Sequence, residues 1–314
     1  AKKLADVKTE IGNKVIGQSD VVDLSLNALL CGGHALLVGV PGLAKTLLVE
    51  TLATVLGLDG KRVQFTPDLM PADIIGSEVL EETGKGKRSF RFIPGPVFCQ
   101  LLMADEINRA SPRTQSALLQ AMQEKFVTVA GEPHDLPAPF HVLATQNPIE
   151  QEGTYPLPEA QLDRFLFQID VDYPKRDTER SILLSTTGTT SSKLKKILSP
   201  KQLQDMQGLV RAMPIGESIV DGILDLVREA RPDQSTNVRI QTGVAWGPGP
   251  RAGQALMLAS RARALLDGRL APSLDDVIAL APAVLKHRMA LTFAARAEGE
   301  TIDDIIAHLV ETIR

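Results

Sequence analysis

Short apolar runs alternate with helix-like stretches along the first half of the chain. Four runs have the length of buried strands, at 34–38, 62–65, 100–104 and 140–145. A first helix is predicted by apolar residues at helical spacing, namely Leu4, Val7, Ile11 and Val15. Further helices are expected to be capped by Ser19 and to cover 45–56. Because strands that are apolar on both faces need cover on both faces, the pattern predicts an α/β domain with a parallel sheet between helices.

Two segments interrupt this alternation, and both are typical of β-hairpins. The first covers 77–92 and turns at Gly84-Lys85-Gly86. The second covers 126–136 and turns at Ala130-Gly131. We expect both hairpins to be insertions into the α/β domain.

The character of the chain changes after Pro174. The stretch 185–196 is polar and typical of a linker, and the residues beyond it favour helices. Ser199-Pro200 provides a cap followed by proline at the first helical position, and Ser273 and Thr301 each precede an aspartate by three residues, as in a capping box. We therefore predict an α/β domain over 1–184, a linker over 185–198 and a small all-α domain over 199–314.

A loop of small residues, Gly39-Val-Pro-Gly-Leu-Ala-Lys45-Thr46, joins the first predicted strand to the helix at 45–56. Small residues let backbone N–H groups approach phosphates, and the helix start adds a positive dipole. Lys45 would reach the β- and γ-phosphates, and the Thr46 hydroxyl would bind Mg²⁺. Alanine replaces the usual second glycine of this motif, and the alternative is a turn that only joins strand and helix. The predicted phosphate-binding residues are Gly39, Val40, Pro41, Gly42, Leu43, Ala44, Lys45, Thr46 and Leu47.

The third predicted strand ends in two carboxylates, Asp105 and Glu106. Successive strand residues point to opposite faces, so the strand end can present one carboxylate to a metal and the other to water. We expect Asp105 to hold Mg²⁺ through its water shell and Glu106 to polarise an attacking water. The alternative is that the pair only caps the following helix.

Composition narrows the kinds of partner. A net charge of -4 and an aromatic content of 4% argue against a nucleic-acid-binding protein. The two cysteines, Cys31 and Cys99, are too few for a disulfide framework and fit a reducing compartment. The first residues contain no apolar run typical of a signal peptide, so we expect none, and no apolar run approaches the ~20 residues that span a bilayer. We expect a cytoplasmic protein without a membrane span.

Together with these two motifs, further segments resemble the MoxR family of AAA+ ATPases over roughly residues 10–312. Val15-Ile-Gly-Gln18 resembles the segment that lines the adenine pocket, and Ala144-Thr-Gln-Asn147-Pro is similar to sensor 1. The segment 156–165, which contains Arg164, resembles the one with the arginine finger. Gly249-Pro-Arg251-Ala resembles sensor 2.

The resemblance implies a P-loop AAA+ core with a small helical lid, and it implies site residues. Ile16 and Gly17 would bind the adenine, and Asn147, Arg164 and Arg251 would be catalytic beside the acidic pair. Arg164 would act on the nucleotide of the adjacent subunit in a homo-oligomeric ring, expected to be a hexamer. Arg251 would act within its own subunit. The alternative for both arginines is a surface or domain-bridging salt bridge.

The resemblance also implies cofactors and partners. ATP and Mg²⁺ would be bound, and hydrolysis would drive the remodelling, assembly or activation of protein clients, often with metal or cofactor insertion. A protein with a von Willebrand factor A domain commonly connects such a motor to its client. Two alternatives stay open: a motor acting on nucleic acid, and a nucleotide-sensing scaffold without turnover. The charge disfavours the first, and Glu106 with Arg164 disfavours the second.

Overall fold

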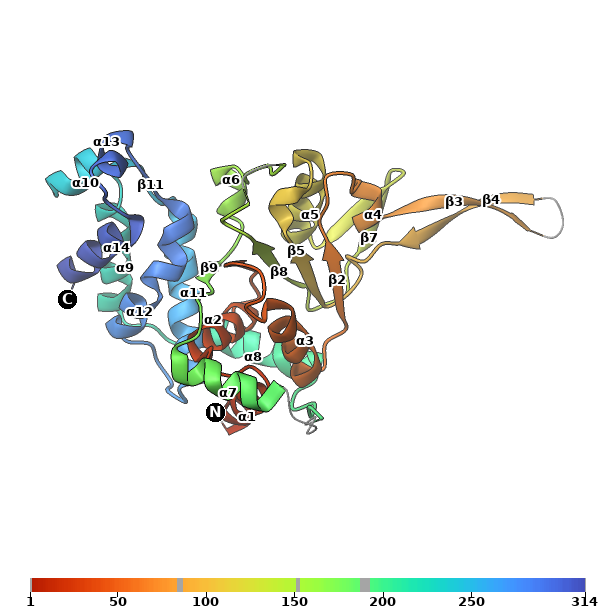
Figure 1. Ribbon diagram of the computed structural model, residues 1–314, viewed down its shortest axis with the longest axis horizontal. Helices are drawn as coiled ribbons and strands as arrows, with labels where there is room; N and C mark the ends of the chain where they lie inside the picture. The colour runs from red at the N-terminus through yellow and green to blue at the C-terminus, as the bar shows by residue number, and fades with distance from the viewer. Residues whose placement is uncertain (1, 84–86, 151–152, 187–192, 314) are drawn as a thin grey trace.

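Five parallel strands form the central sheet, in the order β2-β5-β8-β1-β9 (Figure 1). The computed structural model describes residues 2–83, 87–150, 153–186 and 193–313. The strands are β1 Ala35–Val38, β2 Gly60–Gln64, β5 Leu101–Asp105, β8 His141–Gln146 and β9 Phe167–Asp170. The first four correspond to the predicted apolar runs, and the predicted parallel sheet is confirmed. The edge strand β9 is additional to the prediction.

Helices cover both faces of the sheet, as its apolar strands require. The helices of this domain are α1 Lys2–Gly12, α2 Ser19–Leu30, α3 Lys45–Leu56, α4 Pro71–Ile75, α5 Pro112–Glu124, α6 Glu159–Leu162 and α7 Arg176–Thr186, with a 3-10 turn at Ile107–Arg109. Neighbouring residues of β1 enter different buried clusters: Leu37 packs with α1, α2 and α3, and Leu36 packs with α4 and α5. Ser19 is the first residue of α2 and not its cap, which is Gln18.

Both predicted hairpins are present. β3 Gly76–Thr83 pairs with β4 Lys87–Pro94 and projects away from the sheet (Figure 1), and β6 Phe126–Val129 pairs with β7 Glu132–Asp135. The predicted turn at 84–86 lies outside the described residues. Gly76 has φ of +95°, and a Cβ there would lie 2.3 Å from the carbonyl oxygen of Ile93, so the base of the first hairpin requires glycine. The rings of Phe92 and His134 stack with centroids 3.9 Å apart and join the two hairpins.

The C-terminal lid is helical with one short ribbon. Its helices are α8 Pro200–Ala212, α9 Glu217–Glu229, α10 Val238–Gly243, α11 Pro250–Leu266, α12 Leu274–Leu285, α13 Phe293–Ala297 and α14 Ile302–Thr312, with a 3-10 turn at Lys286–Arg288. An antiparallel ribbon of β10 Val244–Trp246 and β11 Ala290–Leu291 departs from the all-helical expectation. The predicted cap at Ser199 and the predicted capping boxes at Ser273 and Thr301 are confirmed, and Ser199 forms a capping box as well. Across the described ranges, no helix has the length and apolar character needed to cross a bilayer.

The stretch expected to be a linker has packed structure at its described ends. α7 extends to Thr186, and residues 187–192 lie outside the described residues. The backbone N–H groups of Ile197 and Leu198 donate to the carbonyl of Val55 in α3 at 2.8 and 3.1 Å. Because both side chains are apolar and join the core, this part of the chain is fixed to the α/β domain. The domain boundaries stay a prediction.

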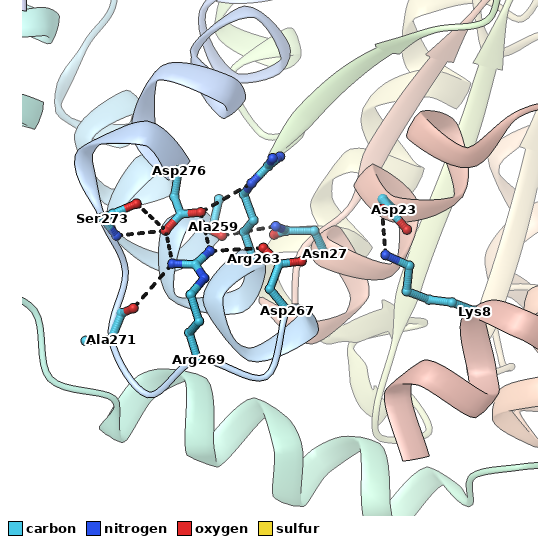
Figure 2. Close-up of polar contacts among 10 residues, drawn as sticks. All are labelled: Lys8, Asp23, Asn27, Ala259, Arg263, Asp267, Arg269, Ala271, Ser273 and Asp276. Atoms are coloured by element: carbon cyan, nitrogen blue, oxygen red, sulfur yellow. Dashed lines mark hydrogen bonds and ion pairs between the residues drawn. The ribbon is translucent and has the colours of Figure 1, made fainter. Parts of the chain in front are cut away.

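Polar contacts order the lid and join it to α2 (Figure 2). Asn27 of α2 donates from Nδ2 to the carbonyl of Ala259 in α11 at 3.0 Å. Within the lid, the buried Asp276 caps α12 and accepts from two nitrogens of Arg269 at 2.8 and 2.6 Å. One continuous apolar cluster contains residues of both domains, so the lid is packed against the α/β domain and not merely tethered to it.

Candidate nucleotide site

The phosphate loop connects the carboxyl end of β1 to the start of α3. Gly42 has φ of +85° and Ala44 has φ of +57°, so two residues are left-handed just before the helix. The alanine therefore adopts the conformation that glycine favours, at a cost of about 1 kcal/mol. Lys45 Nζ donates to the carbonyls of Gly39 and Val40, the second at 3.2 Å. Burial lowers the pKa of Lys45, and the two carboxylates Asp105 and Glu106 oppose that effect.

One cavity of about 530 Å³ brings the phosphate loop and the acidic pair together. It lies where the carboxyl ends of the parallel strands meet, so it collects residues from loops that are far apart in sequence. Its lining consists of Pro41, Gly42, Leu43, Ala44, Lys45, Thr46, Leu47, Arg62, Gln64, Asp105, Glu106, Thr145 and Asn147. Gly39 and Val40, also predicted to bind phosphate, line a neighbouring cavity.

Each carboxylate of the acidic pair is held by specific donors. Asp105 accepts from Arg62 Nη2 at 2.6 Å and Nε at 3.1 Å, and its second oxygen accepts from the Thr145 hydroxyl at 2.6 Å. Glu106, which has φ of +55°, accepts from Gln64 at 2.7 Å and from Arg109 at 3.0 Å. The two carboxylates thus belong to a network with basic and amide groups and do not simply cap a helix.

The cavity contains the donor types that suit a magnesium ion. The Thr46 hydroxyl and the Asp105 carboxylate both line it, and oxygen ligands combined with nucleotide phosphates are what Mg²⁺ prefers in proteins. Over the described part of the chain, no cluster of three or more His, Cys, Asp or Glu side chains could hold a metal by itself. This donor set therefore fits a metal that arrives with a nucleotide.

A smaller, mainly apolar cavity of about 150 Å³ adjoins the phosphate loop. Ile16 lines it as predicted, together with Gln18 and, from the segment leading into α7, Pro174. Gln18 Nε2 donates to the carbonyl of Leu43 at 3.1 Å, and its buried Oε1 has no hydrogen-bond partner among the described residues. An unpartnered acceptor beside an apolar cavity fits the amino group of adenine.

Gly17 supports this adenine cavity without lining it. It has φ of +74°, and a Cβ at this position would lie 1.9 Å from the Thr178 methyl group. The glycine therefore allows the segment before α2 to pack closely on α7. Its predicted direct contact with the nucleotide stays a prediction.

Arg164 and Arg251 lie together, away from the phosphate loop of their own chain. Both line a cavity of about 130 Å³ next to His34, and none of its lining residues lines the phosphate cavity. His34 precedes β1 and Gly39 follows it, so the two cavities lie near opposite ends of a strand about 13 Å long. Asp163 lines the same cavity and accepts from Arg251 at 3.4 Å. This placement does not favour the expected action of Arg251 on its own nucleotide.

Asp163 also forms an ion pair with a buried arginine of the lid, Arg288. Arg288 Nε donates to Asp163 at 2.7 Å, and only 3% of the Arg288 side chain is exposed. Its other nitrogens donate to the carbonyls of Phe165 and Val284 at 2.7 and 2.6 Å. The segment that carries Arg164 is therefore bonded directly to the lid.

Comparison with known proteins agrees with this site. Residues 34–167 match the family described as ATPase family associated with various cellular activities (AAA), and residues 236–309 match the AAA lid domain. Chaperone MoxR1 of Mycobacterium tuberculosis is 43% identical over 97% of this chain and 80% of its own length. Protein MoxR of Paracoccus denitrificans is 31% identical over 96% of this chain and 92% of its own. The chain belongs to the MoxR family of AAA+ ATPases.

A solved structure shows the same fold for this MoxR-family chain. The crystal structure of a candidate ATPase from Cytophaga hutchinsonii superposes with a TM-score of 0.90 at 38% identity. The match covers 99% of this chain and 94% of the other. The predicted P-loop AAA+ core with a lid is thereby confirmed.

Several polar residues of the site were not identified from the sequence of this MoxR-family chain. They are Arg62 and Gln64 on β2, Arg109 after the acidic pair, and Arg288 in the lid. Arg62 and Gln64 lie two positions apart on one strand, so both point to the same face of the sheet, but the sequence does not place that strand beside the acidic pair. For Arg288 the sequence offers only a basic run, 286–288, whose contacts lie in another domain.

Proposed function

We propose that this chain hydrolyses MgATP in a ring of identical subunits and uses the reaction to remodel protein clients. The main support for the proposal is that one cavity is lined by Lys45, Asp105 and Glu106. Thr46 and Asn147 line the same cavity. A cation for the phosphates, one carboxylate for a metal and another for water are the parts that phosphoryl transfer to water requires.

The role of each side chain follows from its chemistry. Lys45 binds the β- and γ-phosphates as a point charge, and Thr46 and Asp105 hold Mg²⁺. The metal ion, when bound, offsets the negative charge of the phosphates. Glu106 orients and polarises the attacking water, and Asn147, at the end of the adjacent strand β8, orients that water or the γ-phosphate.

The position of Arg164 and Arg251 supports a site shared between subunits. Their cavity lies at the amino end of β1, whereas the phosphate loop follows its carboxyl end. We therefore propose that both arginines act on the nucleotide of the adjacent subunit, which changes the role first expected for Arg251. A guanidinium supplied by a neighbour stabilises charge in the transition state and is worth ~10³–10⁵ in rate. A closed ring, expected to be a hexamer, gives every nucleotide such a neighbour.

Protein clients are the proposed target of the motor. One relative is named a chaperone, and the net charge of -4 disfavours an action on nucleic acid. We propose that ATP hydrolysis drives the remodelling, assembly or activation of client proteins, including metal or cofactor insertion. An adaptor with a von Willebrand factor A domain is the proposed connection between ring and client.

Mixing two inactive variants tests the shared site. Arg164→Ala and Glu106→Gln should each bind ATP and lose most turnover, because one lacks the neighbour's cation and the other lacks the base. Only mixed rings contain an intact Glu106 that faces an intact Arg164, so mixing should restore part of the steady-state ATPase rate. No recovery at any ratio, with subunit exchange verified, would contradict the shared site. If the wild-type protein is a monomer and keeps its full ATPase rate per subunit on dilution, the ring is excluded.

The same design separates the two possible roles of Arg251. If Arg251 acts on the neighbour's nucleotide, Arg251→Ala mixed with Glu106→Gln should also recover activity. If it acts within its own subunit, no ring in that mixture contains a complete site, and the rate stays at the level of the separate variants.

A further inference from the structure

The acidic pair is held by residues of strand β2, which lies beside β5 in the sheet. Arg62 binds one oxygen of Asp105 through two nitrogens, at 2.6 and 3.1 Å. Two positions further along β2, Gln64 binds Glu106 at 2.7 Å. The predicted metal-binding carboxylate and the predicted base are thus both engaged by one strand.

The Arg62 contact occupies the atoms that a hydrated metal ion needs. Asp105 Oδ1 accepts from the Thr145 hydroxyl at 2.6 Å, and Oδ2 accepts twice from Arg62, so both oxygens already have donors. A carboxylate has roughly four lone-pair positions, so few remain for water ligands of Mg²⁺. A guanidinium and a divalent cation at the same oxygen also repel each other. Arg62 and the metal therefore compete for Asp105.

A second cavity provides space for Arg62 when it leaves Asp105. This cavity, of about 290 Å³, lies between α3 and strands β2 and β5. Arg62 lines both it and the phosphate cavity. Glu50 of α3 is among its lining residues and offers the guanidinium another carboxylate. Since the Arg62 side chain is 49% exposed, the change of partner does not require unpacking of the core.

We propose that Arg62 is a positioning residue of the magnesium site, which holds Asp105 in place of the hydrated metal and turns to the cavity beside Glu50 when metal-bound nucleotide is seated. The proposal rests on the proposed function, because it assumes that Asp105 binds Mg²⁺. Arg62 thereby sets how much Mg²⁺ is required for tight nucleotide binding. It keeps the acidic pair ordered by a protein cation until the metal replaces that cation.

Equilibrium binding of a fluorescent, non-hydrolysable ATP analogue during a MgCl₂ titration tests this competition. Arg62→Met keeps much of the side-chain length and removes the charge and the donors. The Mg²⁺ concentration at half-maximal binding should fall by about three- to tenfold, the range for a half-exposed, doubly hydrogen-bonded ion pair. Arg62→Lys keeps the charge but not the paired donors, so its Mg²⁺ midpoint should lie between those of the wild type and Arg62→Met. Arg113→Met is the matched control, because it makes the same substitution at an exposed arginine of α5 that lines neither cavity, and its midpoint should stay unchanged.

Two results would overturn the proposal. An unchanged midpoint in Arg62→Met would show that Arg62 does not compete with the metal. Weaker binding of the analogue in Arg62→Met, with and without Mg²⁺, would make Arg62 a phosphate ligand instead. If wild-type binding shows no dependence on Mg²⁺ at all, the proposed function fails at the metal site itself, so the two failures are distinguishable.

The Arg62 side chain provides a readout that is independent of affinity. In ¹⁵N-labelled protein, the Nε–H signal of Arg62, assigned by its loss in Arg62→Lys, should shift when analogue and Mg²⁺ are added together. Adding the analogue with EDTA should leave the signal in place. If the chemical shift of this signal does not change when Mg²⁺ is added in the presence of the analogue, the proposed change of partner is contradicted.

Discussion

Replacing Asp163 by asparagine should destabilise the protein through an arginine that belongs to the lid. Arg288 is 3% exposed and donates to Asp163 at 2.7 Å, and its remaining donors reach the carbonyls of Phe165, Leu166 and Val284. Burial lowers the pKa of Arg288, and its bond to Asp163 opposes that effect. Asp163→Asn keeps the shape but leaves the buried guanidinium without its counter-charge.

The cost of this substitution can be estimated from the burial of the pair. Breaking a buried ion pair by removing one partner costs about 3–5 kcal/mol, and the lower end applies because 28% of the Asp163 side chain is exposed. With an unfolding entropy of about 2.1 cal/mol/K per residue, a loss of about 3 kcal/mol lowers the Tm of 314 residues by about 4–5 °C. Circular dichroism at increasing temperature measures this shift.

A second carboxylate provides the matched control. Asp205 pairs with Lys201 at 3.2 Å, with 59% and 78% of the two side chains exposed. Asp205→Asn makes the same chemical change in an exposed pair, which is worth less than about 0.5 kcal/mol, so its Tm should fall by less than about 1 °C. Equal shifts in the two variants would refute the reasoning, because burial of Arg288 would then have no energetic consequence.

Three further predictions concern binding, coupling and pH. Lys45→Ala should abolish binding of a fluorescent ATP analogue, since the main cationic contact to the phosphates is lost; retained micromolar affinity would exclude the assignment. Removal of 77–92 should spare ATP binding but uncouple client activity, and an unfolded product would instead make the hairpin structural. His141 is buried with a pKa lowered to about 4, chiefly by desolvation, and its two nitrogens contact Gly33 and Gln207. Because the unfolded state binds the proton first, its contribution is complete above pH 6.5 and falls by up to about 3 kcal/mol as pH drops toward 4. Urea unfolding of His141→Gln at several pH values should show a weaker loss over that window, and an identical pH profile would contradict this.

The sequence predicted those strands and turns whose own residues show a distinctive local pattern. Short runs rich in apolar residues predicted four strands, and the loop at 39–46 predicted the strand-to-helix turn whose left-handed residues the structure shows. The edge strand β9 has the sequence Phe-Gln-Ile-Asp and was not predicted, although it has as many apolar residues as the predicted run at 62–65. None of the residues 176–185 of α7 is buried, and the end of this helix falls in the polar stretch from 185 that was predicted to be a linker.

The contacts within the site could not be predicted in the same way. Arg62 contacts Asp105 because β2 and β5 are neighbours in the sheet, and the sequences of the two strands do not determine the order of strands in the sheet. Arg288 meets Asp163 across the boundary between domains. The position of Arg251 depends on how the lid packs on α2 and β9, which composition and spacing do not determine. The expected own-subunit role relied on resemblance alone.

The projecting hairpin has the shape of a lever arm, and the chain enters it from β2, the strand whose side chains contact the acidic pair (Figure 1). Each of its strands has eight residues, which at about 3.3 Å per residue makes an arm of about 26 Å. A tilt of about 10° at its base would move the far end of an arm of that length by about 5 Å. The arm leaves the sheet through α4, shortly after Arg62 and Gln64 on β2. If such a tilt accompanies nucleotide binding, the far end of the hairpin moves by several ångströms at a point far from the nucleotide.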